Sequence, residues 1–348
     1  MDDVRVGIVG YGLAGRVFHG RLLAGSRGAR VTAVVTRDPG RRAQLADDHP
    51  DAVAYDDVAG VLGSVDLLVV ATPNAEHARV AAAAVDAGVP VVVDKPLAVT
   101  AADARALVER AERAGVPLTV FQNRRWDADQ LTLRRLLDGG RLGMVWRYES
   151  RFERWRPVLA TGKWRETLPA AEGGGLLLDL GSHLADQAVH LFGPVAEVSG
   201  RVEARRGAAE DDLVLALTHR SGVASLLWAS AVCAAPGPRL RVLGSEAGYV
   251  AEHLDAQEDA LRAGRRPGDG QPWGVAPPEH GHLLRRGDDA EPLTPEPGRW
   301  DAFYPAVLEA LRAGGPMPVD PWDAVAVLEV LEAARRAADE RTVVRLPG

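Results

Sequence analysis

Lys95 stands out as a residue for acid–base chemistry, because it directly follows a run of apolar, β-branched residues that should be buried. In the stretch VVVDKPLAV, residues 91–99, the apolar run ends at Asp94, Lys95 and Pro96. Strand interiors exclude proline, so we expect the strand to stop at Asp94 and to hold Lys95 at the edge of a sheet. A salt bridge at the surface explains the same residues equally well. The rest of the chain has to decide between a functional site and a solvated ion pair.

Asp179 and His183 form a second candidate group, in the glycine-rich stretch GGGLLLDLGSHLAD that begins at residue 173. They lie four residues apart in an expected helix, so their side chains should share one face and touch. A carboxylate that orients an imidazole raises its basicity, which suits the pair to take a proton from an alcohol. A buried pair that only stabilises the helix is the alternative.

Asp186 and His190 repeat this spacing on a neighbouring face of the same helix, which shows that the pattern arises easily. Binding of a metal ion would require a third and a fourth ligand, and the sequence offers no such set. We therefore predict no metal site.

A glycine motif near the N-terminus predicts a binding site for a dinucleotide. Gly10, Gly12 and Gly15 follow the pattern G-x-G-x-x-G between an expected strand and an expected helix. The first glycine permits a tight turn, the second lets a pyrophosphate approach the backbone, and the third allows the helix to pack closely on the strand. The phosphates would then lie at the positive end of the helix. The residues between these glycines, which we also assign to the cofactor site, are Tyr11, Leu13 and Ala14.

The end of the next strand, VTAVVT, should meet the adenosine ribose of the cofactor. An acidic side chain there favours NAD, because it accepts hydrogen bonds from both ribose hydroxyls and repels a 2′-phosphate. The strand instead leads into Thr36 and Arg37, with Arg41 nearby, and these donors suit a phosphate better than a diol. We therefore predict NADP. Asp38 would favour NAD if it faced the ribose in place of Thr36, and Arg37 could also be a solvated loop residue.

Polar turns follow two further expected strands at the same edge of the sheet. The first of these turns consists of Ala71, Thr72, Pro73 and Asn74. The nicotinamide half of a dinucleotide crosses a sheet of this kind at such a turn. His77 begins the following helix, and we expect it to pack against or cap that helix rather than to react. The second turn contains Asp94, Lys95 and Pro96, so Lys95 should face the reactive end of the cofactor.

The order of the expected elements predicts the fold. Over the first 120 residues, short apolar strands alternate with alanine-rich helices, which is typical of a doubly wound parallel sheet covered on both faces. From about residue 124 the pattern changes to alternating strands joined by turns, which favours an α+β domain with a largely antiparallel sheet. We therefore predict an α/β protein with a Rossmann domain at 1–122 and a second domain at 123–348. We expect 264–299 to be irregular or a short ribbon, and a last helix at about 321–340 to return toward the first domain.

Composition excludes several classes of protein. A chain of 348 residues with 47% hydrophobic and 26% charged residues is typical of a globular protein with two domains. The net charge of −7, without a basic stripe rich in aromatic residues, argues against a nucleic-acid partner. The single cysteine, Cys233, excludes an internal disulfide framework and fits the reducing cytoplasm. No apolar stretch is long enough for a membrane span, so we expect no membrane partner.

These motifs together resemble those of the Gfo/Idh/MocA oxidoreductases, over nearly the whole chain. The shared features are the glycine motif at 10–15, ATPNAEH, DKP in place of the usual Glu-Lys-Pro, NRRWD at 123–127, and the helix that carries Asp179 and His183. Two longer stretches look closest to the NADP-dependent scyllo-inositol dehydrogenase branch. The first begins with FQNRRWDADQ, and the second is GGGLLLDLGSHLADQAVHLFG.

The resemblance implies an open-faced C-terminal sheet that forms a homodimer or homotetramer, and a catalytic group of Lys95, Asp179 and His183. The side chains that it implies in the pocket, where Asn123 would also meet the cofactor, are Asn123, Arg124, Trp126 and Trp164. The implied activity is hydride exchange between a nicotinamide cofactor and a secondary alcohol of a cyclitol or sugar, most similar to scyllo-inositol. Lys95 and His183 could exchange the roles of oxyanion donor and proton acceptor. A dehydrogenase of another sugar, and an NADP-binding sensor without turnover, are the alternatives.

Overall fold

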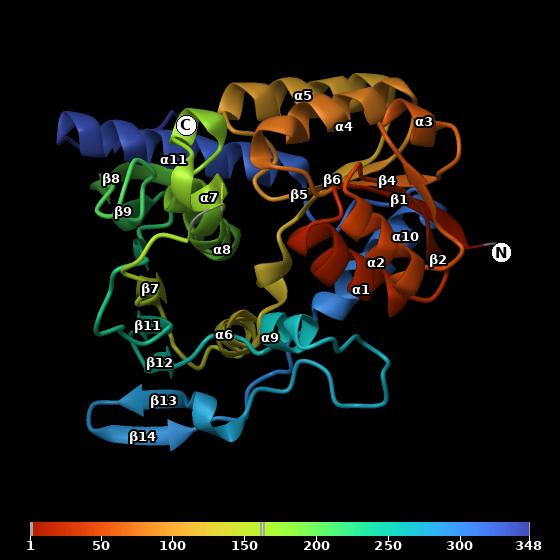
Figure 1. The fold of residues 1–348 in the computed structure, drawn as a ribbon. Coiled ribbons are helices and arrows are strands. Elements are labelled where there is room, and N and C mark those ends of the chain that lie inside the picture. The colour runs from red at the N-terminus through yellow and green to blue at the C-terminus, as the bar shows by residue number, and fades with distance from the viewer. Residues whose placement is uncertain (1–2, 161, 163, 348) are drawn as a thin grey trace.

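The computed structural model describes residues 3–160, 162 and 164–347, which form two β-sheets flanked by helices (Figure 1). The first sheet has six strands and the second has nine. All strands of the first sheet lie before residue 122, and all strands of the second lie after it. We propose that the domain boundary falls at residue 122 for this reason.

The first sheet is parallel throughout and has the strand order β3-β2-β1-β4-β5-β6. This order is that of the dinucleotide-binding Rossmann fold, with its switch point between β1 and β4. Its strands are β1 (Val4–Val9), β2 (Ala29–Val35), β3 (Val53–Tyr55), β4 (Leu67–Val70), β5 (Val91–Asp94) and β6 (Leu118–Phe121). Its helices are the π-helix η1 (Leu13–Gly20), α1 (Arg21–Ala24), α2 (Pro39–Asp48), α3 (Ala59–Leu62), η2 (Asn74–Glu76), α4 (His77–Asp86) and α5 (Ala101–Ala114).

Burial explains why the central strands carry continuous apolar runs. Every residue of β4 and β5 is buried, because helices cover both faces of the sheet. Figure 1 shows α4 and α5 over one face and α1 and α2 over the other. Asp94 is the last residue of β5, so the strand does stop where the charged residues begin, as the sequence predicts.

The second sheet has the order β14-β13-β12-β11-β7-β10-β9-β8-β15 and is antiparallel except for the pair β7 and β10. The prediction of a mostly antiparallel sheet is therefore confirmed. Its strands are β7 (Val145–Glu153), β8 (Val195–Glu203), β9 (Asp212–His219), β10 (Ala224–Ser230), β11 (Leu240–Gly244), β12 (Gly248–Ala251), β13 (His282–Arg286), β14 (Asp289–Pro292) and β15 (Val344–Arg345). The antiparallel pair β13 and β14 is the short ribbon expected within 264–299.

The helices of the second part pack mainly on one face of this sheet. They are η3 (Asn123–Trp126), α6 (Ala128–Asp138), α7 (Trp164–Thr167), η4 (Ala170–Glu172), the π-helix η5 (Leu177–Gly181), α8 (Ser182–Phe192), α9 (Gln257–Arg262), η6 (Pro278–His280), η7 (Trp300–Ala302), α10 (Phe303–Ala313) and α11 (Pro321–Glu340). Helix α8 packs against β7 and β10, and α11 packs against β8. Because helices cover one face of the sheet, the side chains of β9 alternate between buried and exposed. Leu213, Leu215 and Leu217 are buried, and Val214 is exposed.

Two late helices tie the second part of the chain to the first. Helix α11 contacts α8 and also α5 of the Rossmann part, so the expected return of this helix is confirmed (Figure 1). Helix α10, which the sequence analysis did not anticipate, packs Phe303 on Phe121 at the end of β6, with ring centroids 4.9 Å apart. These contacts fix the carboxyl edge of the first sheet against the second sheet.

Candidate active site

The glycine turn after β1 is as close to its neighbours as a phosphate-binding turn requires. Gly10 has a φ of +91°, and a side-chain carbon at this position would lie 2.6 Å from the carbonyl oxygen of Ala71. A side-chain carbon on Gly15 would lie 1.9 Å from the carbonyl oxygen of Gly10. No residue other than glycine fits these two positions without movement of the backbone. The turn leads directly into η1, so its amide groups are free for an anion.

The residues after β2 divide into tethered and free side chains. The Nε of Arg37 donates to the carbonyl oxygen of Asp56, and the carboxylate of Asp38 caps α2 by accepting the backbone N–H of Arg41 at 3.0 Å. The Arg41 guanidinium has no ion pair or hydrogen bond within the described chain. Its Nη2 lies 3.9 Å from where a side-chain carbon of Gly12 would be. The guanidinium of Arg41 is therefore an unpaired cation close to the glycine turn.

His77 connects the two turns at the carboxyl edge of the first sheet. Its Nδ1 lies 2.7 Å from the carbonyl oxygen of Pro96, and its Nε2 lies 2.9 Å from that of Thr72. The ring is fully buried, and burial lowers its pKa. His77 therefore holds the turns together, which agrees with the packing role expected for it. The Oγ1 of Thr72 is buried without a hydrogen-bond partner in the described structure, and a bound ligand could satisfy it.

Asn74, in the first of these turns, reaches the second part of the chain. Its Nδ2 donates to the carbonyl oxygen of Gly173 at 2.8 Å. This contact anchors the glycine-rich segment that leads into η5. Asn74 thus positions the segment on the substrate side of the site. Its Nδ2 is used in this contact.

Lys95 is paired with Asp179, 84 residues further along the chain. Its Nζ donates to the carboxylate Oδ1 of Asp179 at 2.9 Å and to the backbone oxygen of the same residue at 2.5 Å. Burial alone would raise the pKa of Asp179, but the positive charges of Lys95 and Arg165 overcome it and lower this pKa to about 2. The carboxylate therefore stays ionised, and the pair is a fixed ammonium–carboxylate contact. The carboxylate of Asp94 accepts the backbone N–H of Lys95 at 2.9 Å and holds the lysine backbone.

His183 is buried at 5% exposure and makes no hydrogen bond within the described chain. Its Nδ1 is one of the few buried polar atoms without a partner. Burial, and then the positive charges of Lys95, Arg124 and Arg239, hold its pKa well below the usual range. The imidazole is therefore neutral at pH 7 and free to accept a proton.

The expected contact between Asp179 and His183 is wrong. Asp179 lies in η5, and its carboxylate contacts Lys95 and Arg165 instead of the imidazole. The ammonium of Lys95 and the guanidinium of Arg165 are full positive charges, so they hold the carboxylate of Asp179 more strongly than a neutral imidazole would. The second pair of this spacing is also separated, since Asp186 binds Arg125 at 2.6 Å and His190 contacts Arg134.

One cavity of about 420 Å³ brings most of the predicted catalytic and substrate-binding residues together. Lys95, Asp179 and His183 all line it, which confirms that the distant segments converge. Other predicted residues in its wall are Leu13, Ala14, Asp94, Asn123, Arg124 and Trp164. The unpredicted residues of the wall include Phe18, Phe121, Arg154, Arg156, Arg165 and Trp300.

Two predicted side chains point elsewhere. Trp126 is outside the wall of the cavity and packs edge-on against Phe303, with ring centroids 5.8 Å apart. Trp300 lines the cavity in its place. The side chain of Tyr11 is turned into the interior, where its hydroxyl donates to Asp48 at 3.1 Å. Only the backbone of Tyr11 can therefore serve the glycine turn.

The chain belongs to the Gfo/Idh/MocA family of oxidoreductases. Residues 4–122 match the family domain described as "Oxidoreductase family, NAD-binding Rossmann fold", and residues 134–346 match "Oxidoreductase family, C-terminal alpha/beta domain". Together these domains cover most of the chain and agree with the two sheets. The protein is thus an oxidoreductase with a nicotinamide-dinucleotide domain.

Individual relatives match the chain over almost its full length. It is 35% identical to the scyllo-inositol 2-dehydrogenase (NADP(+)) IolW of Bacillus subtilis, over 99% of this chain and 97% of that protein. It is 37% identical to the uncharacterized oxidoreductase YdgJ of Escherichia coli, over 99% of each chain. Among solved structures, the putative oxidoreductase yvaA of Bacillus subtilis superimposes with a TM-score of 0.92 at 33% identity, over 99% of each chain. No helix among the described residues is long and apolar enough to cross a membrane.

Proposed function

We propose that the protein is an NADP-dependent dehydrogenase that acts on the secondary alcohol of a cyclitol or sugar, most similar to scyllo-inositol. One observation carries this proposal: an ammonium group and a neutral imidazole line the same cavity, at the carboxyl edge of a Rossmann sheet. The relative IolW is a scyllo-inositol 2-dehydrogenase, which supports the substrate class.

Lys95 is suited to stabilise negative charge on the reacting oxygen. An ammonium group has three N–H donors, and Asp179 accepts two of them. The third is left for the oxygen of the substrate. Because the lysine side chain is only 11% exposed, its charge acts in a poorly screened environment. Asp179 was expected to orient the imidazole of His183, but it positions the ammonium group of Lys95 instead.

His183 is suited to accept the hydroxyl proton of the alcohol. Its neutral ring has no competing hydrogen bond within the described chain, so a ring nitrogen is free to accept this proton. In the reductive direction the same ring would return the proton to the oxygen. The bound nicotinamide accepts or supplies the hydride.

The residues present fit a dinucleotide with a 2′-phosphate. Gly10, Gly15 and the start of η1 would hold the pyrophosphate, and the unpartnered Oγ1 of Thr72 lies beside this turn. Asp38, the residue that could favour NAD, is occupied as the cap of α2. The free guanidinium of Arg41 then supplies the charge that a 2′-phosphate requires. This arrangement supports NADP over NAD.

Purified protein incubated with NADP⁺ should oxidise at least one of scyllo-inositol, myo-inositol and glucose, with a kcat/KM at least about tenfold higher than with NAD⁺. This factor corresponds to one favourable contact with the 2′-phosphate. Absorbance of the reduced cofactor at saturating polyol measures both rates. Oxidation of sugars alone would replace the cyclitol by a sugar as the substrate. A higher kcat/KM with NAD⁺ would refute the cofactor assignment.

We also propose that the open face of the second sheet joins two copies of the chain. Leu226, Trp228 and Val214 lie on the face opposite α8 and α11, and Arg151 stacks on the ring of Trp228 at 3.9 Å. Light scattering should show a dimer or tetramer, and Trp228→Glu should shift it toward the monomer, because a carboxylate would be buried in the contact. Val53→Glu, at an exposed position of the first sheet, is the matched control. A monomeric parent protein at micromolar concentration would contradict this proposal.

A further inference from the structure

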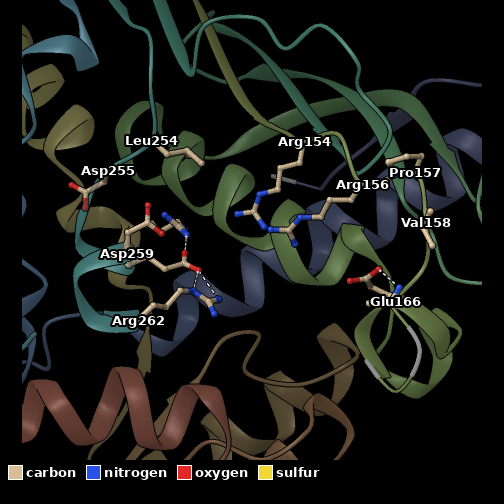
Figure 2. A pocket seen from close by; sticks show the side chains of 12 residues that line it. Arg154, Arg156, Pro157, Val158, Glu166, Leu254, Asp255, Asp259 and Arg262 are labelled. Atoms are coloured by element: carbon tan, nitrogen blue, oxygen red, sulfur yellow. Dashed lines mark hydrogen bonds and ion pairs between the residues drawn. The ribbon is translucent and has the colours of Figure 1, made fainter. Parts of the chain in front are cut away.

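A second and larger chamber adjoins the catalytic cavity. Its volume is about 660 Å³, and its wall lies between the segment that follows β7 and helix α9 (Figure 2). The residues that line both spaces are Arg124, Arg154, Arg156, Glu166, Glu258 and Arg262. A substrate whose alcohol lies at Lys95 and His183 could therefore extend into this chamber.

Arg154 and Arg156 give this chamber its chemical character. Figure 2 shows their side chains next to each other, with both guanidinium groups directed into the pocket. Neither group has a carboxylate within ion-pair distance or a hydrogen bond from its side chain in the described parts of the chain. Burial lowers the pKa of Arg154; the negative charge of Glu258 opposes this shift, and the positive charges of Arg156 and Arg124 add to it. Arg154 is partly buried and Arg156 is exposed, so an anion in the chamber could accept hydrogen bonds from both guanidinium groups.

The acids around the chamber do not neutralise this pair. Glu258 binds Arg124 at 2.6 Å and Arg262 at 2.8 Å. Asp255 accepts the backbone N–H groups of Ala128 and Gln257.

The remaining acids of the wall are Glu166 and Asp259. Glu166 contacts Arg206 at 3.3 Å, and Asp259, an exposed residue of α9, has no ion pair among the described residues. Arg206 is in turn bound to Asp211 at 2.8 Å. Arg154 and Arg156 are therefore the two cations of the chamber wall that have no ion pair among the described residues.

We propose that Arg154 and Arg156 bind an anionic group of the substrate, so that the substrate is a cyclitol or sugar that carries a phosphate or a carboxylate. Guanidinium groups bind both anions through paired, charge-assisted hydrogen bonds. The inference rests on the proposed function, because it places the alcohol of this substrate at Lys95 and His183. It narrows the substrate class from neutral polyols to acidic ones.

Kinetics with matched pairs of substrates test this inference. Glucose is compared with glucose 6-phosphate and glucuronate, and myo-inositol with inositol 1-phosphate, at saturating NADP⁺. The kcat/KM of at least one acidic member should exceed that of its neutral partner by at least about tenfold, mainly through a lower KM. This ratio should fall by at least about tenfold in the double variant Arg154→Gln, Arg156→Gln. Arg336→Gln, an exposed residue of α11, is the control and should leave the ratio unchanged.

The possible outcomes separate this inference from the proposed function. If neutral polyols are oxidised as efficiently as every acidic partner, the anion subsite is refuted and the dehydrogenase stands. If no member of the panel is oxidised with either cofactor, the proposed function fails. Calorimetry with inorganic phosphate and sulfate then decides the subsite without turnover: binding that is lost in the double variant supports it, and no binding overturns it. Preference for phosphate or for carboxylate identifies the acidic group.

Discussion

Replacing Lys95 by methionine should lower the kcat of polyol oxidation by about 10²–10³-fold, the usual effect of losing one donor to a developing oxyanion. Methionine keeps much of the length of the side chain but removes the ammonium group and its contacts with Asp179. The KM for the polyol should change less than kcat, because the donor acts most strongly when charge develops on the oxygen. A fluorescence titration with NADPH separates loss of chemistry from loss of the cofactor.

The pH profile gives this prediction a second readout. Oxidation requires a neutral His183, so the rate should fall as the pH drops through the pKa of this residue, below its usual range. The positive charge of Lys95 contributes to that lowering. In Lys95→Met the pKa of His183 should therefore rise, and the acid limb of kcat/KM should move to higher pH. A lysine that only supported the fold would leave the acid limb in place.

Arg105→Met is the matched control for Lys95→Met. Arg105 forms an ion pair with Glu329 on the surface between α5 and α11, so this variant also removes a cation from a carboxylate. It should keep the parent kcat and the parent pH profile. If Lys95→Met changed neither turnover nor polyol binding while NADPH still bound tightly, a nucleotide-binding sensor would become the better account of the protein.

The first sheet could be predicted from sequence because its signals are local. The buried runs of β4 and β5 and the glycine turn each occupy fewer than ten consecutive residues, and their chemistry specifies strand or turn directly. Helix α10 was missed because its residues pack on β6 and η1, two elements near the other end of the chain, and its sequence follows an irregular stretch. Its existence depends on a tertiary contact that a local pattern does not report.

The candidate site was predicted in part. Lys95, Asp179 and His183 do reach one cavity, but the predicted partner of Asp179 was wrong, because its actual partner, Lys95, lies 84 residues away and helical spacing cannot reveal it. Trp126 and Trp300 illustrate the same limit. Both lie in short helices, and their tertiary contacts distinguish them: Trp126 packs on Phe303, whereas Trp300 lines the cavity. Arg154 and Arg156 alternate with Trp155 just after a strand. This pattern is typical of a solvated strand end, and only the structure shows that both arginines line a chamber.

Replacing Gly15 by alanine should weaken NADPH binding by at least about tenfold and lower the free energy of unfolding by about 1–3 kcal/mol. The added carbon would lie 1.9 Å from the carbonyl oxygen of Gly10, which is a backbone atom and cannot rotate away. The turn after β1 must therefore open. Its amide groups then leave the positions that a pyrophosphate needs at the start of η1. NADPH fluorescence titration and denaturant unfolding measure the two effects.

Gly63→Ala separates the glycine turn from the general effect of adding a methyl group. Gly63 ends α3 with a φ of −80°, and an added carbon there meets no other atom within 4 Å. This variant should bind NADPH like the parent and gain about 0.4–1 kcal/mol of stability, because alanine restricts the unfolded chain. If Gly15→Ala is as stable as Gly63→Ala and binds NADPH as well, the turn has room that the structure does not show. The pyrophosphate site would then have to lie elsewhere on the sheet.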